Sequence, residues 1–307
     1  HLEKFRDLRE KNAVLIKEAK EGGRKVVGIY CTYCPRELVL AAGAIPVSLC
    51  GTREAPIAHA ERELPRNLCP LIKSTYRFAL TDTCPFFHFS DLVIGETTCD
   101  GKKKMFERLR RLKEVHVMNL PNSADTEAAL TLWHGEMIRL KSRLEAFLRV
   151  SIMEEKLREA IHLVNEEKRA LKGLYDLNRR KPALLSGLDM MMASFQAGFH
   201  VDRREVIRMI DGLVAEIRDA AAKGHIAGGE KTPRVLLTGT PIGMGSEKVI
   251  EIVESLGALV VAMENCGGYK TVDLRIDESD PRDPLLLLAE KYLRIPCSVM
   301  SPNGGRL

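Results

Sequence analysis

Aromatic residues are scarce in this chain: they make up 5% of its 307 residues, and there is a single tryptophan. Platforms that stack the bases of single-stranded nucleic acid are built from aromatic side chains, so a protein of that class is not indicated. The formal net charge is only +5, and lysine and arginine alternate with glutamate along the helical stretches. Such a pattern is typical of solvated helix faces. We therefore expect no nucleic-acid partner.

Long hydrophobic runs are also missing. No run approaches the ~18 apolar residues of a membrane-spanning helix, and the charged residues 1–12 lack the apolar core of a signal peptide. The composition, 45% hydrophobic and 29% charged, is that of an ordinary globular protein. At ~100–200 residues per domain, the length allows about two domains. These features predict a cytoplasmic protein with no membrane partner, in a compartment where disulfides are rare.

Cysteine is absent from residues 100–265, although the chain has eight cysteines. Six of them fall within the first 99 residues, and the full set is Cys31, Cys34, Cys50, Cys69, Cys84, Cys99, Cys266 and Cys297. Cys69, Cys84 and Cys99 are spaced fifteen residues apart, each next to a proline or an Asp-Gly pair that favours a turn. Cysteines clustered at turns in a reducing compartment are typical of metal binding or redox chemistry. The clustering predicts a site.

Short apolar runs alternate with helical patterns in the first third of the chain, which predicts a parallel α/β sheet. The expected strands are 25–30, 45–49, 91–95 and 115–119. Ligands of such sheets gather outside the carboxyl ends of the strands, and Cys31, Cys34, Cys50 and Cys99 each follow one of these ends. A long helical region over residues 124–222 comes next. Strands at 234–238, 258–263 and 296–300, the last carrying Cys297, then indicate a second α/β region.

The expected fold is therefore α/β, with two flavodoxin-like parallel-sheet domains linked by a long helical segment. We place an N-terminal α/β domain with most of the cysteines at residues 1–122 and the helical segment at 123–232. The second α/β domain covers 233–307, and its few strands suggest that it is cut short at its C-terminus. A Gly-rich turn at 239–247 lacks the spacing of either common phosphate-binding motif, so we read it as a tight turn that opens a helix.

The cysteine spacing leaves several readings open. Cys31-x-x-Cys34 alone suits a thioredoxin-like pair, but that reading does not account for the other cysteines. A zinc ribbon needs a second CxxC, and a ferredoxin-type cluster needs a tight cysteine run; neither is present. Single cysteines on separate strand-end loops remain, which suits an iron–sulfur cluster. The candidates are Cys34, Cys69, Cys84, Cys99, Cys266 and Cys297. We read Cys50 as structural because it ends an apolar strand.

Several phrases in the chain resemble the 2-hydroxyacyl-CoA dehydratase superfamily. They are CPRELVLAAGAIP, LCPLIKS, DTCPFF, TTCDGKKK, ENCGG and PCSVMSPN, and together they span most of the sequence. Within the superfamily, the chain is most similar to the double-cubane cluster proteins. The resemblance implies that Cys69 and Cys99 are ligands shared with the dehydratases. It also implies that Cys34 (with Cys31 as its alternate), Cys84, Cys266 and Cys297 are the additional ligands of a second cubane.

The resemblance further implies a double-cubane [8Fe–9S] cluster that reduces small molecules. Low-potential electrons would come from an ATP-hydrolysing partner that carries its own [4Fe–4S] cluster, and the protein would be an anaerobic homodimer. Members of the family usually continue past SPN to a further cysteine, so a ligand beyond Leu307 is expected. The resemblance leaves the catalytic residues unassigned. Glu37 and His88 are polar neighbours of the cysteine loops, although a helix acid and a surface histidine account for them as well.

Two other functions compete with this one. The first is a subunit of a 2-hydroxyacyl-CoA dehydratase that holds one [4Fe–4S] cluster, but one cubane leaves three cysteines without a role. The second is a non-enzymatic metal-binding protein, such as a cluster carrier or a zinc-stabilised binding protein. The sequence favours the double-cubane reductase and does not specify its physiological substrate.

Overall fold

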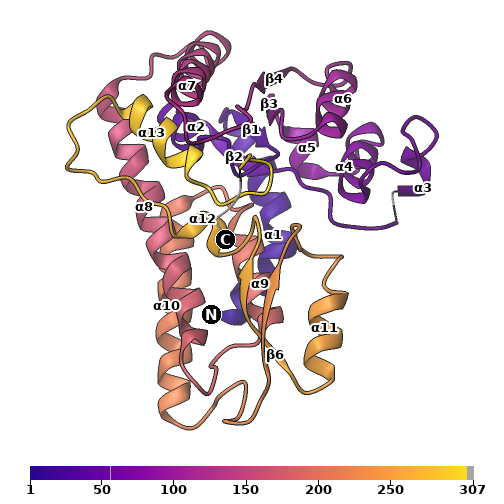
Figure 1. Ribbon diagram of the computed structural model, residues 1–307, viewed down its shortest axis with the longest axis vertical. Helices are drawn as coiled ribbons and strands as arrows, with labels where there is room; N and C mark the ends of the chain where they lie inside the picture. The colour runs from indigo at the N-terminus through magenta and orange to yellow at the C-terminus, as the bar shows by residue number, and fades with distance from the viewer. Residues whose placement is uncertain (56, 303–307) are drawn as a thin grey trace. The chain divides into compact units, whose positions relative to one another are not determined.

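The computed structural model describes residues 1–55 and 57–302, and the chain forms two compact units (Figure 1). Unit 1 consists of residues 1–15 and 166–273. Unit 2 consists of residues 16–165 together with the chain from Leu274 onward. Each unit therefore combines segments that are far apart in sequence. The expected division at residues 122 and 232 stays a prediction.

Unit 2 contains a four-stranded parallel sheet with the strand order β2-β1-β3-β4. Its strands are β1 (Val26–Ile29), β2 (Ile45–Ser48), β3 (Leu92–Glu96) and β4 (Val115–Met118). Val26 lies opposite Ile45, and Val93 lies opposite Val115. All four strands were predicted to within about one residue at each end. The α/β class of this part of the chain is confirmed.

Helices cover both faces of this sheet. Along the strands, Val27, Ile29, Leu92 and Ile94 point into one core, which also contains residues of α2 (Arg36–Ala41), α7 (Glu127–Leu148) and α13 (Pro284–Leu293). The intervening positions face the other side because successive side chains of a strand alternate between faces. There, a Cβ on Gly95 would lie 2.3 Å from the ring of Phe106. Glycine at this position therefore allows α6 (Asp100–Leu109) to pack against the sheet.

Three further helices of unit 2 follow the cysteine-containing loops. They are α3 (Ile57–Ala60), α4 (Pro70–Leu80) and α5 (Pro85–Phe89), of which the sequence pattern, helical at 71–80, predicts only α4. Both α4 and α5 begin with proline in the first turn, directly after Cys69 and Cys84. Proline suits this position because its missing N–H would have no partner within the helix. The local sequence thus sets each of these cysteines at the start of a helix.

Unit 1 is mostly helical and contains a small parallel sheet. Its helices are the latter part of α8 (Glu154–Asp176), the 3₁₀ helix η1 (Leu177–Arg179), α9 (Gly187–Ala197), α10 (Arg203–Ala222), α11 (Lys248–Ser255) and α12 (Tyr269–Val272), and the first residues of α1 (Leu2–Glu21) also belong to it. Strands β5 (Arg234–Thr238) and β6 (Leu259–Glu264) pair in parallel, with a bulge between Val235 and Leu236. Met190, Met191 and Met192 are buried in its core, as flexible packing residues.

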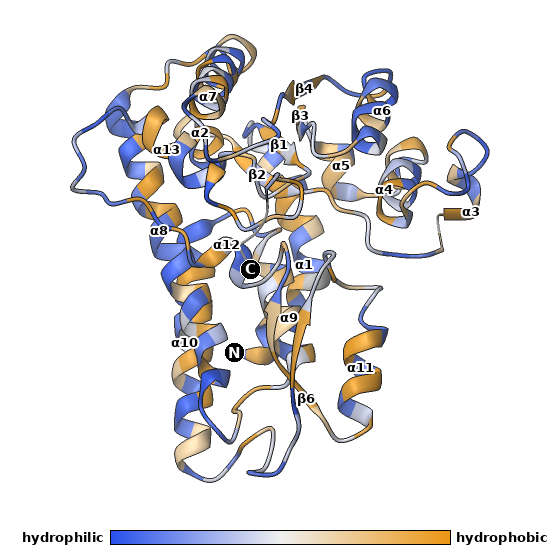
Figure 2. Cartoon of the chain, in the orientation of Figure 1, coloured by the Kyte–Doolittle hydropathy of each residue, from blue (hydrophilic) through white to orange (hydrophobic). Residues whose placement is uncertain are grey.

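The long helices are amphipathic, and Figure 2 shows polar and apolar residues alternating around α8 and α10. In α10, Val206, Ile210 and Leu213 are buried at helical spacing. The Asp202 carboxylate caps this helix by accepting hydrogen bonds from the backbone N–H groups of the first turn, at 2.8 and 3.2 Å. None of the helices in the described part of the chain is both long enough and apolar enough to cross a membrane.

The expected strand at 296–300 is wrong. This stretch forms turns, in which the Met300 N–H donates to the Cys297 carbonyl at 3.1 Å. Pro296 has no N–H to donate to a neighbouring strand, and the run is only five residues long. Short apolar runs of this kind do not distinguish a strand from a buried turn. Cys297 therefore lies in a turn after α13.

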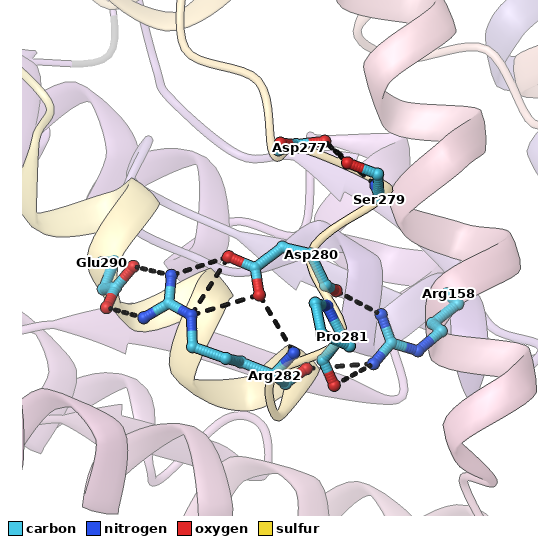
Figure 3. Close-up of polar contacts among 7 residues, drawn as sticks. All are labelled: Arg158, Asp277, Ser279, Asp280, Pro281, Arg282 and Glu290. Carbon is cyan, nitrogen blue, oxygen red and sulfur yellow. Dashed lines mark hydrogen bonds and ion pairs between the residues drawn. The ribbon is translucent and has the colours of Figure 1, made fainter.

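An arginine anchors the loop that leads into α13 (Figure 3). The Arg158 guanidinium donates to the backbone carbonyls of Asp280, Pro281 and Arg282, at 3.2, 3.4 and 2.9 Å. Arg282 in turn pairs with Asp280 at 2.8 Å and with Glu290 of α13 at 2.7 Å. The Arg158 side chain thus supplies the hydrogen bonds that these carbonyl oxygens would otherwise accept from water. This network fixes the start of α13.

Candidate metal centre

Cysteines gather at one edge of the sheet in unit 2. Cys31 follows β1, Cys50 follows β2, and Cys99 lies three residues after β3. The carboxyl ends of parallel strands meet at the same edge, which is where ligands of α/β sheets bind. The strand-end placement predicted from the sequence is confirmed for these three residues. None of the eight cysteines is in a disulfide.

Cys69 and Cys99 stand at two helix starts that touch each other. Cys69 precedes α4 and Cys99 precedes α6, and both side chains are exposed. A Cβ added to Gly101 would lie 2.7 Å from Ile72 and 2.8 Å from Leu68, so the first turn of α6 packs directly against the start of α4. The two thiols that the family resemblance predicts as shared ligands are therefore carried by adjacent loops.

The start of α6 also supplies a hydrogen bond to sulfur. The backbone N–H of Lys102 donates to Cys99 Sγ at 3.4 Å, so the cysteine caps the helix. The N-terminal end of a helix carries a partial positive charge that favours a negatively charged ligand atom. The Cys99 sulfur is thus oriented by the backbone of its own helix.

Cys84 approaches the end of β1 from the start of α5. Burial raises the pKa of its thiol, and the nearby N–H groups of Phe87 and Phe86 oppose that effect. Burial raises the pKa of the phenol of Tyr30, the residue after β1, and the nearby Cys84 and Cys50 add to this shift. The Cys50 thiol also donates to the Tyr30 carbonyl at 3.2 Å. Cys84 and Cys50 thus belong to the same edge as Cys31.

Cys31 interacts electrostatically with Lys102, with Cys50 and with the buried Glu96. Burial raises the pKa of the Cys31 thiol to about 11; the Lys102 ammonium opposes this shift, while Glu96 and Cys50 add to it. Burial likewise raises the pKa of Cys50, again with Lys102 opposing and Glu96 adding. Both thiols are therefore protonated at neutral pH, and a metal that bound them would have to displace the proton.

Glu96 is a functional candidate that the sequence did not single out. Its side chain is fully buried at the end of β3, and neither carboxylate oxygen has a hydrogen-bond partner in another described residue. Burial raises the pKa of this carboxyl to about 8, with Lys102 opposing the shift. Unpaired buried carboxyls are uncommon outside functional sites. The only signal in the sequence is an acid that closes the apolar run of β3.

Cys34 is the most buried of the predicted ligands. It is 1% exposed and belongs to the apolar core, while Cys31 is half-buried and only packs against that core. Burial raises the pKa of the Cys34 thiol well above its ordinary value, and Glu96 and Glu37 reinforce this shift. The choice between Cys34 and its alternate Cys31 stays a prediction. Their surroundings make Cys31 the more accessible thiol.

Glu37 is an acid in the first turn of a helix, as the sequence indicated, but its carboxylate is engaged in a buried ion pair. It is fully buried in the first turn of α2, where it pairs with the Lys291 ammonium and accepts a hydrogen bond from the Tyr292 hydroxyl at 2.8 Å. This group joins α13 to the loop of Cys34. His88, by contrast, is exposed and bonded to Asp82 at 2.7 Å, in agreement with its reading as a surface residue.

Two predicted ligands come from further along the chain. Cys297 is half-buried and packs against the same apolar core as Cys34. Cys266 belongs to unit 1, where it follows β6 in a tight turn and is half-buried. In that turn, the Gly267 N–H donates to the Asn265 side chain at 2.9 Å. Cys266 thus occupies a strand-end loop, as its sequence context indicated.

The donor set suits a cluster better than a single metal ion. Among the described residues, no three His, Cys, Asp or Glu side chains surround one point closely enough to hold an ion. The thiolates of a cubane bind different iron atoms, so its donors are spread out instead of converging on one point. Apart from Cys50, which we read as structural, the edge of unit 2 presents Cys31, Cys69, Cys84 and Cys99 on separate loops. Their number and their thiol chemistry fit an iron–sulfur cluster.

Comparison with known proteins identifies the family to which the chain is similar. The family described as 2-hydroxyglutaryl-CoA dehydratase, D-component, matches residues 31–307. A putative dehydratase subunit, YjiM, of Escherichia coli (strain K12) is 45% identical over 99% of this chain and 79% of its own length.

More distant relatives are subunits of named enzymes. The beta subunit of (R)-phenyllactyl-CoA dehydratase from Clostridium sporogenes is 23% identical over 96% of this chain and 76% of its own. A benzoyl-CoA reductase subunit from Thauera aromatica is 24% identical over 90% of this chain and 70% of its own. The similarity thus extends to subunits of both dehydratases and a reductase.

Proposed function

The chain belongs to the 2-hydroxyglutaryl-CoA dehydratase D-component family, and from this we propose that it is an iron–sulfur subunit that transfers low-potential electrons. The observation that carries the proposal is the set of thiols on separate loops at one edge of the unit 2 sheet. The family match supports it because its relatives are subunits of dehydratases and of a reductase. In its specific form, the protein is a double-cubane [8Fe–9S] reductase of small molecules.

The cluster ligands in this proposal are Cys34, Cys69, Cys84, Cys99, Cys266 and Cys297. Cys69 and Cys99 are supported most directly, because their exposed thiols stand on helix starts that touch. If the more accessible thiol binds the cluster, Cys31 takes the place of Cys34 as a ligand. A bound cluster would supply one-electron chemistry at a potential set by its thiolates and their hydrogen bonds.

Two residues of the chain itself, Lys102 and Glu96, control the charge at this site. The Lys102 N–H holds the Cys99 sulfur, and the Lys102 ammonium is the cation that opposes the effect of burial on Cys31 and Cys50. Glu96 keeps a proton near neutral pH, because burial raises the pKa of its carboxyl to about 8. This carboxyl is therefore able to hold or donate a proton at the same edge.

The proposal includes partners and an assembly. An ATP-hydrolysing protein with its own [4Fe–4S] cluster supplies the electrons, a small molecule accepts them, and the chain forms a homodimer. Eight cysteines without disulfides suit a reducing compartment, which we take to be the cytoplasm. We also propose that the two sheets represent two flavodoxin-like regions joined by the long helices.

Metal analysis of anaerobically purified protein tests the proposal. We expect about eight iron atoms per chain with matching acid-labile sulfide, because two cubanes hold four irons each. Zinc without sulfide would contradict every iron–sulfur reading and leave a zinc-stabilised binding protein as the function.

A dehydratase subunit with a single [4Fe–4S] cluster is the second candidate. It is favoured by the names of the relatives, which include dehydratase beta subunits from Clostridium sporogenes and Anaerotignum propionicum. In that case the same analysis gives about four iron atoms per chain. The spectrum of the reduced protein would then be that of one isolated cubane, with no coupling to a second.

A further inference from the structure

Cys266 lies at the tip of a tight turn in unit 1. The turn covers residues 265–268, directly after β6, and the Gly268 N–H donates to the Asn265 carbonyl at 3.0 Å. The Asn265 side chain is buried and accepts a hydrogen bond from the Gly267 N–H at 2.9 Å. Asparagine suits the first position of a β-turn, because its side chain can bond to the backbone two residues further on. Cys266 and Gly267 therefore occupy the two central positions of a well-defined β-turn.

The path of the chain after Cys266 depends on Gly268. A Cβ at this position would lie 2.0 Å from the carbonyl oxygen of Met263, far inside van der Waals contact. Only glycine lets the backbone pass so close to the end of β6. The steric fit at Gly268 thus restricts the conformations that are open to the turn.

A side chain from a helix remote in sequence also holds this turn. Tyr175, in the last turn of α8, is 1% exposed, and its hydroxyl donates to the carbonyl of Gly267. A buried phenol usually finds a hydrogen-bond partner, and here the partner is the backbone of the residue that follows Cys266. The two residues are 92 positions apart. Tyr175 therefore ties the tip of the turn to the helical part of unit 1.

A second tyrosine lies beside the first but has a different partner. Tyr269 is the first residue of α12, and its ring centroid lies 5.3 Å from that of Tyr175. Its hydroxyl donates to the carboxylate of Asp176, the last residue of α8. Tyr175 thus binds the backbone of the turn, whereas Tyr269 binds a side chain. The two hydroxyls can be removed separately.

We propose that Tyr175 is a positioning residue for Cys266, an inference that rests on the proposed role of Cys266 as a cluster ligand. Hydrogen bonds around the ligands of a metal site orient those ligands, and their loss typically lowers metal affinity by about 10- to 100-fold. The Tyr175 hydroxyl acts through the Gly267 carbonyl, so it restrains the loop that carries the sulfur. Its effect on the cluster is therefore indirect and is separate from thiolate binding itself.

Tyr175→Phe tests this inference, because it removes the hydroxyl and keeps the ring. Gly267 is exposed, so water can bind its carbonyl in the variant, and thermal unfolding should stay close to that of the wild type. Hydrogen exchange of the anaerobically purified full chain measures the order of the turn. The amides of residues 267 and 268 should exchange roughly 3- to 10-fold faster in the variant, since the loss of one hydrogen bond favours local opening by about that factor.

The rate of iron release measures the consequence for the cluster. With the ferrous chelator bathophenanthroline in excess, Tyr175→Phe should lose its iron about tenfold faster than the wild type. Tyr269→Phe is the matched control, because it makes the same chemical change in the same pair of rings but leaves the bond to the Gly267 carbonyl intact. Exchange and iron release in this control should stay within about twofold of the wild type, since its hydroxyl is half-buried and its partner Asp176 can bind water instead.

Three results would overturn the inference. They are wild-type hydrogen exchange in Tyr175→Phe, faster exchange with wild-type iron release, or equal effects of the two tyrosine substitutions. In each case the wild type still contains iron and sulfide, so the iron–sulfur proposal stands. A wild-type protein without iron would instead contradict that proposal, and the role of Tyr175 with it.

Discussion

Cys99 and Cys50 follow strands of the same sheet at the same edge but differ in their surroundings. Cys99 is exposed at a helix start, whereas Cys50 is half-buried and donates to the Tyr30 carbonyl. We expect Cys99→Ser to lose iron and acid-labile sulfide together, because serine is a poor ligand for iron in a cluster. Its folding stability should stay within about 0.5 kcal/mol of the wild type, as for other surface changes.

Cys50→Ser is the control for this experiment. A serine hydroxyl can also donate to the Tyr30 carbonyl, so the local structure should be retained. Iron and sulfide should stay at the wild-type level if Cys50 is structural, as the sequence suggested. Full iron retention in Cys99→Ser would instead remove Cys99 from the ligand set.

His116 should make the protein sensitive to acid. Burial and three nearby arginines lower its pKa to about 4 in the folded state, whereas the unfolded chain has the ordinary value near ~6.5. As pH falls from about 6.5 towards 4, the unfolded state takes up a proton that the folded state does not. The stabilisation from a neutral His116 is thus complete above about pH 6.5 and is lost on acidification.

His116→Gln isolates this contribution, because glutamine does not titrate. Between pH 7 and pH 5, the wild type should lose roughly 1–2 kcal/mol more unfolding free energy than the variant, with the half-buried position reducing the full effect. Denaturant unfolding at the two pH values measures the difference. An equal loss in both proteins would show that His116 is protonated normally.

Two glutamates have environments in the folded protein that their local sequence does not reveal. The sequence marks Glu37 only as a helix acid and does not single out Glu96, yet both are fully buried. Glu37 is paired with Lys291, which lies 254 positions further along the chain, and Glu96 has no hydrogen-bond partner in another described residue. No local pattern distinguishes these two environments. Only the folded structure shows that the Glu37 carboxylate is paired with a cation, whereas the Glu96 carboxyl is able to hold a proton or bind a ligand.

At the scale of elements, Gly95 sets how α6 packs on the sheet. A Cβ at this position would lie 2.3 Å from the Phe106 ring, well inside van der Waals contact. We expect Gly95→Ala to destabilise the protein by about 1–3 kcal/mol, because the helix or the ring must move. Since α6 carries Cys99 at its start, bound iron should fall as well. Denaturant unfolding and metal analysis measure the two effects.

Gly135, within α7, provides the opposite case. A Cβ there would meet no atom within 4 Å. Gly135→Ala should therefore stabilise the protein by up to about 1 kcal/mol, through the higher helix propensity of alanine. Equal effects of the two substitutions would mean that space at Gly95 does not limit the packing of α6.

Elements with a clear local signal were predictable from the sequence. The strands of the first sheet, the strands β5 and β6, and the long helices all appear where their periodicity placed them. The short helices α3 and α5 were missed because they contain too few residues to show a period. The stretch 296–300 was misread for a related reason: a short, mostly apolar run suits a strand or a buried turn equally well.

At the scale of the whole molecule, the chain is assembled from distant segments. Unit 1 joins residues 1–15 to 166–273, and unit 2 joins the first half of the chain to its last described part. In unit 2, Arg158 holds the loop before α13, and α13 supplies the partner of Glu37. Composition and periodicity do not predict such pairings, because they depend on how separate elements pack.

Local sequence patterns were sufficient to predict the family, the α/β class and the turns that carry most of the cysteines. These depend on motifs, on short-range periodicity and on prolines and glycines, all of which act locally. The tertiary structure decided which thiols are exposed, that the loops of Cys69 and Cys99 touch, and that Glu96 is buried beside Cys31. These features arise from burial and from contacts between elements remote in sequence, because desolvation acts on a side chain only once the chain around it has packed.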